Sequence, residues 1–214
     1  MKRIIYMFAT VLVSVCFISC SVNSGKINKV REVTVTDIEN MEISGNVELH
    51  IVQGNVTKLR LEGNHAIIDA TKITQNGGCL KVINEFNPDN GGNNSLKSNG
   101  VKVYLAAPNM KKLKAVGNVI VTTDDPIKNN NLSLSVIGNC IIKMKLEKTN
   151  KSDFSISGNS IVNIDYKDCG YSKVNIEDNS IAMLDGTMHK KMFVSSKGNV
   201  IVINNVKDNV EKKN

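Results

Sequence analysis

Short runs of alternating apolar and polar residues recur along the second half of the chain at a nearly constant spacing. One such run places Phe154 and Ile156 before a Gly-Asn pair at Gly158, and another places Val162 and Ile164 after it. A period of two is typical of a β-strand that buries one face. Each repeat is therefore expected to supply two short strands, one on either side of a tight turn.

Gly-Asn pairs mark the period of these repeats. Successive pairs in the second half are 21, 20, 20 and 20 residues apart, with an Asp-Asn pair in one place, and two earlier pairs extend the pattern. The predicted turn residues are Gly45, Asn46, Gly63, Asn64, Gly117, Asn118, Gly138, Asn139, Gly158, Asn159, Asp178, Asn179, Gly198 and Asn199. Gly accepts a positive φ and Asn tolerates the left-handed region, so we interpret these residues as structural. Stacked Asn amides can also form a hydrogen-bonded ladder.

A fixed period near 20 residues predicts an all-β stack of similar coils, with two facing parallel sheets wound into a flattened coil. We expect one solenoid domain over residues 33–206, with a polar loop inserted at 87–100. The charged segment 207–214 is expected to cap the last sheet edge.

One isoleucine in each repeat needs an explanation. If the third, fifth and seventh positions face inward, an outward column contains Ile120, Ile141, Ile161, Ile181 and Ile201. The turn could act as a bulge that moves this residue into the core. Alternatively, the apolar stripe is buried against other copies in a homo-oligomer related by rotation about the long axis. We favour the first interpretation.

The start of the chain has the features of an export signal. Lys2 and Arg3 precede an uncharged, mostly apolar run from Ile4 to Ile18, which predicts a signal peptide over residues 1–19. The sequence Phe-Ile-Ser before Cys20 resembles a bacterial lipobox, although Phe stands where an aliphatic residue is usual. We therefore expect acylation of Cys20, with residues 20–32 as a polar tether.

Charge and cysteine content narrow the choice of partners. Without residues 1–19 the chain has 25 basic and 20 acidic residues, a net charge of +5. The lysines are scattered and lack interleaved aromatic residues, so no nucleic-acid partner is predicted. Cys79, Cys140 and Cys169 form no CxxC motif, and Cys140 is expected to be a small buried residue. The sequence leaves a Cys140–Cys169 disulfide open.

Acidic and imidazole side chains give no catalytic pattern. Asp165 and Asp185 occupy the same repeat position and are expected to lie on one edge about 5 Å apart. Their interpretation as turn-forming residues is preferred to a calcium site. His50, His65 and His189 are isolated in the sequence and are expected at the surface. No enzyme activity, cofactor or metal is predicted.

Several segments together resemble a known family. They are Glu42–Gly45, Val47–Gly54, Val101–Pro108 and the repeats that follow Leu113. The chain between Val33 and Asn205 is similar to the auto-transporter adhesin head (GIN) domain family, common in exported lipoproteins of Bacteroides-type bacteria. The resemblance implies a right-handed β-helix-like solenoid, a role in adhesion, and trimers by analogy with trimeric adhesin heads. The family's turns are typically Gly-Ser-Gly, so a shared ligand is not carried over.

The expected function is thus a non-enzymatic, lipid-anchored envelope protein that acts as an adhesin-like or scaffold module. The alternative is a carbohydrate-binding or carbohydrate-active β-helix of the envelope. Expected partners are the membrane through the lipid, further copies of the chain, and a glycan or protein ligand. The outer membrane is the expected location, with the periplasmic face favoured because Ser21–Ser24 contains no acidic residue.

Overall fold

The computed structural model describes residues 20–21, 28–52, 54, 58–85, 100–106, 110–197, 200–204 and 210–213. The predicted signal peptide, the 87–100 insertion except Gly100, and the Gly198–Asn199 pair lie outside the described residues. Within the described part, no helix is long and apolar enough to span a membrane.

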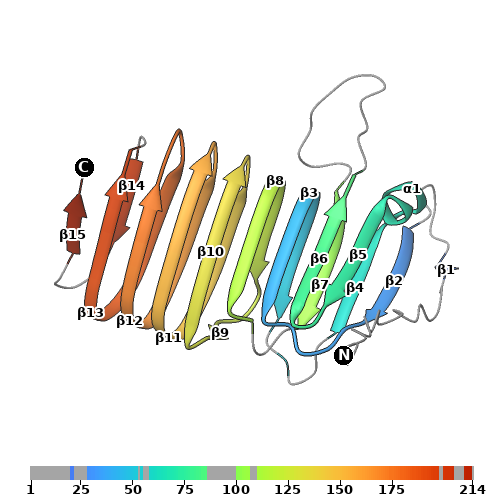
Figure 1. The fold of residues 1–214 in the computed structure, drawn as a ribbon, viewed down its shortest axis with the longest axis horizontal. Helices are drawn as coiled ribbons and strands as arrows, with labels where there is room; N and C mark the ends of the chain where they lie inside the picture. The colour runs from blue at the N-terminus through green and yellow to red at the C-terminus, as the bar shows by residue number, and fades with distance from the viewer. Residues whose placement is uncertain are drawn as a thin grey trace, which may run out of the picture.

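Almost every described element is a β-strand. The strands are β1 (Cys20–Ser21), β2 (Asn28–Thr34), β3 (Asn40–Val52), β4 (Lys58–Asn64), β5 (Thr71–Asn76), β6 (Cys79–Asn84), β7 (Val101–Ala106), β8 (Lys112–Thr123), β9 (Ile127–Lys128), β10 (Asn131–Gly138), β11 (Ile141–Gly158), β12 (Ile161–Ile176), β13 (Ile181–Ser196), β14 (Val200–Asn204) and β15 (Val210–Lys213), with one short helix, α1 (His65–Asp69). All of these strands belong to one mixed sheet that is not closed. Along its main path the strand order is β1-β2-β4-β7-β3-β8-β10-β11-β12-β13-β14 (Figure 1).

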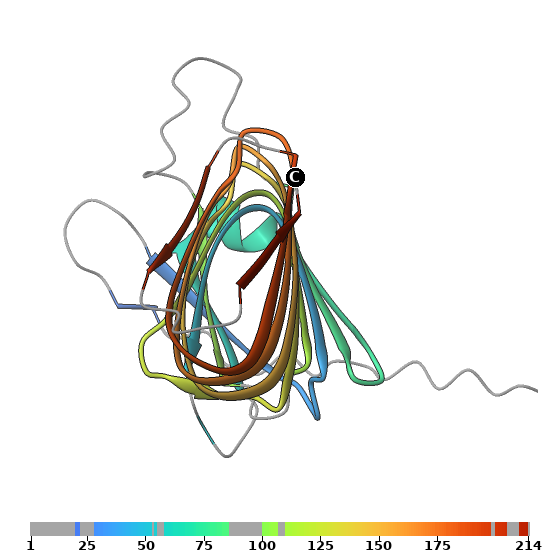
Figure 2. The same cartoon turned by 90° about the vertical axis from the view of Figure 1, so that its left-hand side faces the viewer.

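The C-terminal repeats stack in parallel and in register. Gly138 of β10 lies beside Gly117 of β8 on one side and Gly158 of β11 on the other. The expectation of two short strands per repeat is wrong in one respect: β11, β12 and β13 each run through the looser turn as one strand of 16–18 residues. Viewed along the stack, these strands trace nested curves (Figure 2).

The predicted inward positions form the core. Phe154, Ile156, Val162 and Ile164 have no exposed surface, and Cys140 is fully buried as expected. Removing such apolar side chains from water contributes about 1.5–3 kcal/mol each. The alternation of inward apolar and outward polar residues therefore stabilises every rung of the stack.

Three polar side chains inside this core form a hydrogen-bonded cluster. The hydroxyl group of Tyr166 lies 3.3 Å from Oγ of Ser152 and 3.2 Å from Oγ of Ser172, two serines in register on β11 and β12. Burial raises the pKa of Tyr166, and burial likewise raises the pKa of Cys169 to about 11. Cys140 and Cys169 are free thiols, so they are not joined by the disulfide that the sequence left open.

The N-terminal half departs from the repeat. β4 runs antiparallel to β2 and β7, and β5 and β6 form an antiparallel pair. Gly63–Asn64 is accordingly not a repeat turn: Asn64 ends β4 and caps α1 by accepting the backbone N–H of Ile67 at 2.9 Å. The sequence assigned residues 20–32 to a tether, but Cys20–Ser21 and the first residues of β2 are paired strands.

The prediction that Ile201 continues the isoleucine column is wrong. In β14 the backbone of Val200 lies beside Ile181, and Ile201 lies beside Ala182, a core position. The backbone of Ile201 is therefore out of register with the column that ends at Ile181. β15 pairs with β13 within the segment expected to be the cap.

The backbone at the repeat turns takes a positive φ at the Gly position and not at the Asn position. Gly45, Gly117, Gly138 and Gly158 have φ values between 93° and 113°, and Asp178 takes the same place with φ 60°. None of the described Asn residues has a positive φ, so tolerance of the left-handed region, the explanation expected from the sequence, does not account for the Asn at these turns.

We expect Gly158→Ala to lower the free energy of unfolding by about 1–3 kcal/mol, because a side chain at its φ of 93° is strained. The added Cβ would also lie 2.5 Å from the carbonyl oxygen of Gly138. Urea denaturation measures the loss. Gly63→Ala is the control, since its Cβ would meet only ordinary contacts at 3.5 Å or more; equal losses in both variants would contradict the backbone explanation.

Candidate interaction surfaces

A ladder of asparagine side chains runs along the turn edge of the stack. The Nδ2 group of each Asn donates to Oδ1 of the preceding one, at 3.0 Å for Asn118 to Asn46, 3.2 Å for Asn139 to Asn118, 3.2 Å for Asn159 to Asn139 and 3.3 Å for Asn179 to Asn159. The predicted ladder is therefore confirmed over five repeats. All of these bonds are at exposed positions, so the edge presents a continuous row of amides.

In two repeats the small buried residue after the ladder Asn is a serine that hydrogen-bonds to the neighbouring turn. Ser160 Oγ donates to the carbonyl oxygen of Gly138 at 2.8 Å, and Ser180 Oγ donates to that of Gly158 at 3.2 Å. The backbone N–H of Asn159 donates to Gly138 as well, at 2.9 Å. The carbonyl oxygens of Gly138 and Gly158 thus each accept from both a backbone amide and a buried hydroxyl group of the next repeat.

The isoleucine column faces outward along four successive repeats. Ile120, Ile141, Ile161 and Ile181 lie side by side on β8, β11, β12 and β13. Three are half-buried and Ile161 is 40 % exposed. The favoured interpretation, in which the turn moves these residues into the core, is therefore wrong, because the strand keeps its alternation from the turn onward.

A row of planar polar groups crosses the N-terminal strands. Arg60, Tyr104 and His50 lie side by side on β4, β7 and β3. The His50 and Tyr104 rings are stacked with centroids 4.9 Å apart, and Cζ of Arg60 lies 6.0 Å from the Tyr104 centroid. Neighbouring groups thus cover both faces of the Tyr104 ring, and burial raises the pKa of Tyr104. Tyr104 can offer an edge to a ligand, but no face on which a sugar could stack.

His50 is partly exposed on the outer face of β3, as expected, and hydrogen bonds hold its ring on both sides. Its Nε2 lies 3.0 Å from Oε1 of Glu48, and its Nδ1 lies 3.0 Å from Oγ1 of Thr122. A hydroxyl, an imidazole and a carboxylate in this order can activate a nucleophile. Such catalysis also needs donors for an oxyanion. The described strand β3 is paired with β7 on one side and β8 on the other, which uses its backbone amides in the sheet.

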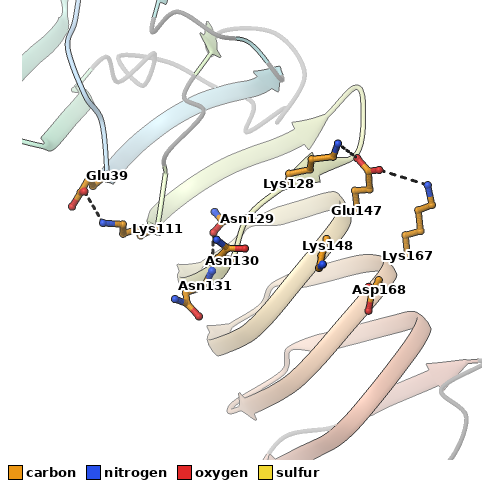
Figure 3. Close-up of a pocket in the computed structure, with 10 residues that line it drawn as sticks. All are labelled: Glu39, Lys111, Lys128, Asn129, Asn130, Asn131, Glu147, Lys148, Lys167 and Asp168. Carbon is orange, nitrogen blue, oxygen red and sulfur yellow. Dashed lines mark hydrogen bonds and ion pairs between the residues drawn. The ribbon is translucent and has the colours of Figure 1, made fainter.

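A polar hollow of about 900 Å³ lies at the opposite, looser edge of the stack, beside β9 (Figure 3). Its lining consists of Glu39, Lys111, Lys128, Asn129, Asn130, Asn131, Glu147, Lys148, Lys167 and Asp168. Lys128 and Lys167 approach the Glu147 carboxylate from the two flanking strands, with N–O distances of 3.5 and 3.7 Å. Lys111 pairs with Glu39 at 2.6 Å.

Sequence reasoning missed this hollow, although a signal was present. Lys128, Lys148 and Asp168 are 20 residues apart, as are Glu147 and Lys167. Residues at one repeat position lie on adjacent rungs, so the spacing predicts that these charges stack. The same logic succeeded for Asp165 and Asp185, which are in register on β12 and β13. Among the described residues, no three His, Cys, Asp or Glu side chains come together as a metal site.

The fold and its surfaces define an all-β protein of stacked repeats with long polar faces. Comparison with known families gives the more specific class. A family model described as "Putative auto-transporter adhesin, head GIN domain" matches residues 37–211, and the chain belongs to this family. No match is found among curated proteins.

Solved structures with a similar fold come from Bacteroides and Parabacteroides species. One is described as a "putative adhesin" from Bacteroides fragilis, with a TM-score of 0.54 and 11 % identity, covering 90 % of this chain and 99 % of that one. Another "putative adhesin", from Parabacteroides distasonis, has the same TM-score and identity and covers 88 % of this chain and 98 % of that one. These likenesses support the fold.

We expect Asn139→Ala to lower the free energy of unfolding by about 1–2 kcal/mol, because it removes two ladder hydrogen bonds of about 0.5–1.5 kcal/mol each. Thermal or urea unfolding measures the effect. Asn175→Ala is the control, since Asn175 points outward on β12 and its side chain has no hydrogen bond within the described part of the chain. Similar stabilities for the two variants would show that the ladder contributes nothing.

Proposed function

We propose that the protein is a non-enzymatic, lipid-anchored lipoprotein of the cell envelope that acts as an adhesin-like contact module. Membership of the adhesin head family over residues 37–211 carries the proposal. The in-register stack supports it, because it holds rows of identical side chains on a rigid scaffold. Rows of this kind suit repeated, low-affinity contacts better than the binding of one small substrate.

The proposal includes the shape of the scaffold. Each repeat of about 20 residues would form one turn of a right-handed, flattened solenoid, stacked about 4.8 Å from the next. The parallel register of β10 to β13 supports this arrangement in the C-terminal half. The antiparallel strands β2 and β4 would then close the N-terminal end of the stack.

Acylation at Cys20 is the proposed anchor. The backbone of Cys20 pairs with Lys29 of β2, the strand nearest the N-terminal edge of the sheet. Acyl chains on Cys20 would therefore hold this edge toward the membrane and direct the later repeats away from it. We propose the outer membrane as the location and favour its periplasmic face.

Contact between copies of the chain is a further part of the proposal, with trimers as the family analogy implies. The outward isoleucines Ile120, Ile141, Ile161 and Ile181 span three rung steps, about 15 Å. A stable interface buries about 800 Å² on each partner, more than one such stripe provides. The stripe alone would therefore support only weak association, strengthened when anchoring confines the copies to one membrane.

A carbohydrate-binding role is the second candidate function, and the polar hollow favours it. Ammonium groups, carboxylates and amides converge there from β9, β11, β12 and the segment before β10. Side chains of these types can donate and accept hydrogen bonds to sugar hydroxyl groups.

The anchor is tested by Cys20→Ala in the native organism. We expect the variant to move from the membrane fraction to the soluble fraction and to lose labelling by a palmitate analogue, because no acyl chain can be attached. Cys79→Ala is the matched control and should stay in the membrane. Unchanged labelling of the Cys20 variant would contradict the proposal.

Protease treatment of intact cells tests the orientation. With the protein on the periplasmic face, we expect a C-terminally tagged copy to survive until the outer membrane is permeabilised. A periplasmic marker serves as the control. Cleavage in intact cells would place the protein outside and make adhesion to neighbouring cells the function to pursue; protection favours the scaffold role.

A further inference from the structure

We propose that the hollow beside β9 binds a polysaccharide that carries carboxylate groups, such as a chain of uronic acids. The inference rests on the second candidate function given above and names its ligand class. It is argued from the size of the hollow, the charges around it and the fixed backbone of Asn129, Asn130 and Asn131, which line one side of it.

The size and lining of the hollow suit a hydrophilic chain. Its volume of about 900 Å³ falls within the range of about 300–1,000 Å³ that ligand sites occupy. All ten lining residues are Lys, Asn, Glu or Asp. The ammonium, carboxylate and amide ends of these side chains can hydrogen-bond to sugar hydroxyl groups, and their aliphatic stems can contact the apolar faces of sugar rings (Figure 3).

The charges favour an anionic ligand. Lys128 and Lys148 occupy paired positions on β9 and β11, so their ammonium groups line adjacent rungs. Lys148 is exposed, and no carboxylate within the described part of the chain pairs with it. Four lysines face three carboxylates in the hollow, and Glu147 is shared by two of these lysines. A ligand carboxylate could thus pair with Lys148 without displacing a protein ion pair.

Rearranging the ion pairs between Glu147 and the two lysines on ligand binding would cost little free energy. The side chains of Lys128 and Lys167 are 69 % and 72 % exposed, and their distances to Glu147 exceed those of a tight pair. Ion pairs between exposed groups contribute about 0–1 kcal/mol. A second ligand carboxylate could therefore share Lys128 or Lys167 with Glu147.

Hydrogen bonds within the protein hold the backbone of Asn129, Asn130 and Asn131 in place without a ligand. The carbonyl oxygen of Asn130 accepts from the backbone N–H groups of Asn150 and Lys151, at 2.9 and 3.1 Å. Asn129 donates from Nδ2 to the carbonyl oxygen of Met110 and accepts from the N–H of Asn131 at 3.1 Å. The exposed side chains of Asn130 and Asn131 thus stand on a held backbone, which reduces the entropy lost on binding.

Binding of polygalacturonate oligomers to the purified full-length protein in detergent tests the proposal by calorimetry. The matched probe is the methyl-esterified oligomer, which keeps the hydroxyl groups and lacks the charge. We expect saturable binding of the acid form, weakened at least tenfold by methyl esterification, by Lys148→Glu and, less strongly, by Lys148→Gln. Lys143→Glu makes the same charge change at an exposed lysine of β11 outside the hollow and should alter the affinity less than twofold.

The inference would be overturned by no binding of the acid form, by equal binding of the esterified form, or by equal loss in the Lys143 variant. Stronger binding of inorganic polyphosphate would identify a different class of anion and would also overturn it. Thermal unfolding of each variant checks that the fold is intact. The adhesin-like function is judged separately: if protease treatment of intact cells shows the protein outside, attachment of cells that carry Lys148→Glu is compared with that of cells carrying the unchanged protein. Unchanged attachment together with absent glycan binding would reject this site and leave that function standing.

Discussion

The close parallel contact between glycine backbones at the repeat turns is the constraint on which the rest of the structure depends. A Cβ on Gly138, Gly158 or Gly117 would lie 2.5–3.2 Å from the carbonyl oxygen of the preceding glycine, so the chains approach more closely than side chains allow. That carbonyl oxygen accepts from the next repeat's Asn N–H and, in two repeats, from a buried Ser hydroxyl. The glycine turn thus fixes the register of each repeat against the next at one point. The strands on either side of the turn keep this register along their length.

Fixed register turns one repeat position into one stripe on the surface. The asparagine ladder, the isoleucine column and the lysines of the hollow all arise in this way, although they differ in chemistry. At the ladder, neighbouring side chains satisfy one another, which stabilises the edge. Between Lys128 and Lys148 the stacked ammonium groups repel each other. Glu147 pairs with Lys128 and Lys167 and not with Lys148, which leaves Lys148 for another anion.

The sequence predicted the C-terminal half well, because there the same residues recur and every level of the pattern agrees. It failed at Gly63–Asn64, a pair identical to the true turns, because a dipeptide does not determine whether its strand pairs in parallel. The hollow was missed for a different reason. Its residues lie in the loose turns, where the alternation that guided the prediction ends, and only their spacing of 20 residues carries the signal.

Repetition also determines what kind of ligand such a surface can hold. Each exposed ion pair or hydrogen bond contributes about 1 kcal/mol or less, too little for one contact to retain a partner. A polymer with evenly spaced groups meets several rungs at once, and after the first contact the others form at a high effective concentration. The stack therefore favours repetitive partners, such as a glycan chain or a layer of identical molecules, over compact ones. This selectivity follows from the backbone register at the glycine turns, while the side chain at each repeat position determines which polymer fits.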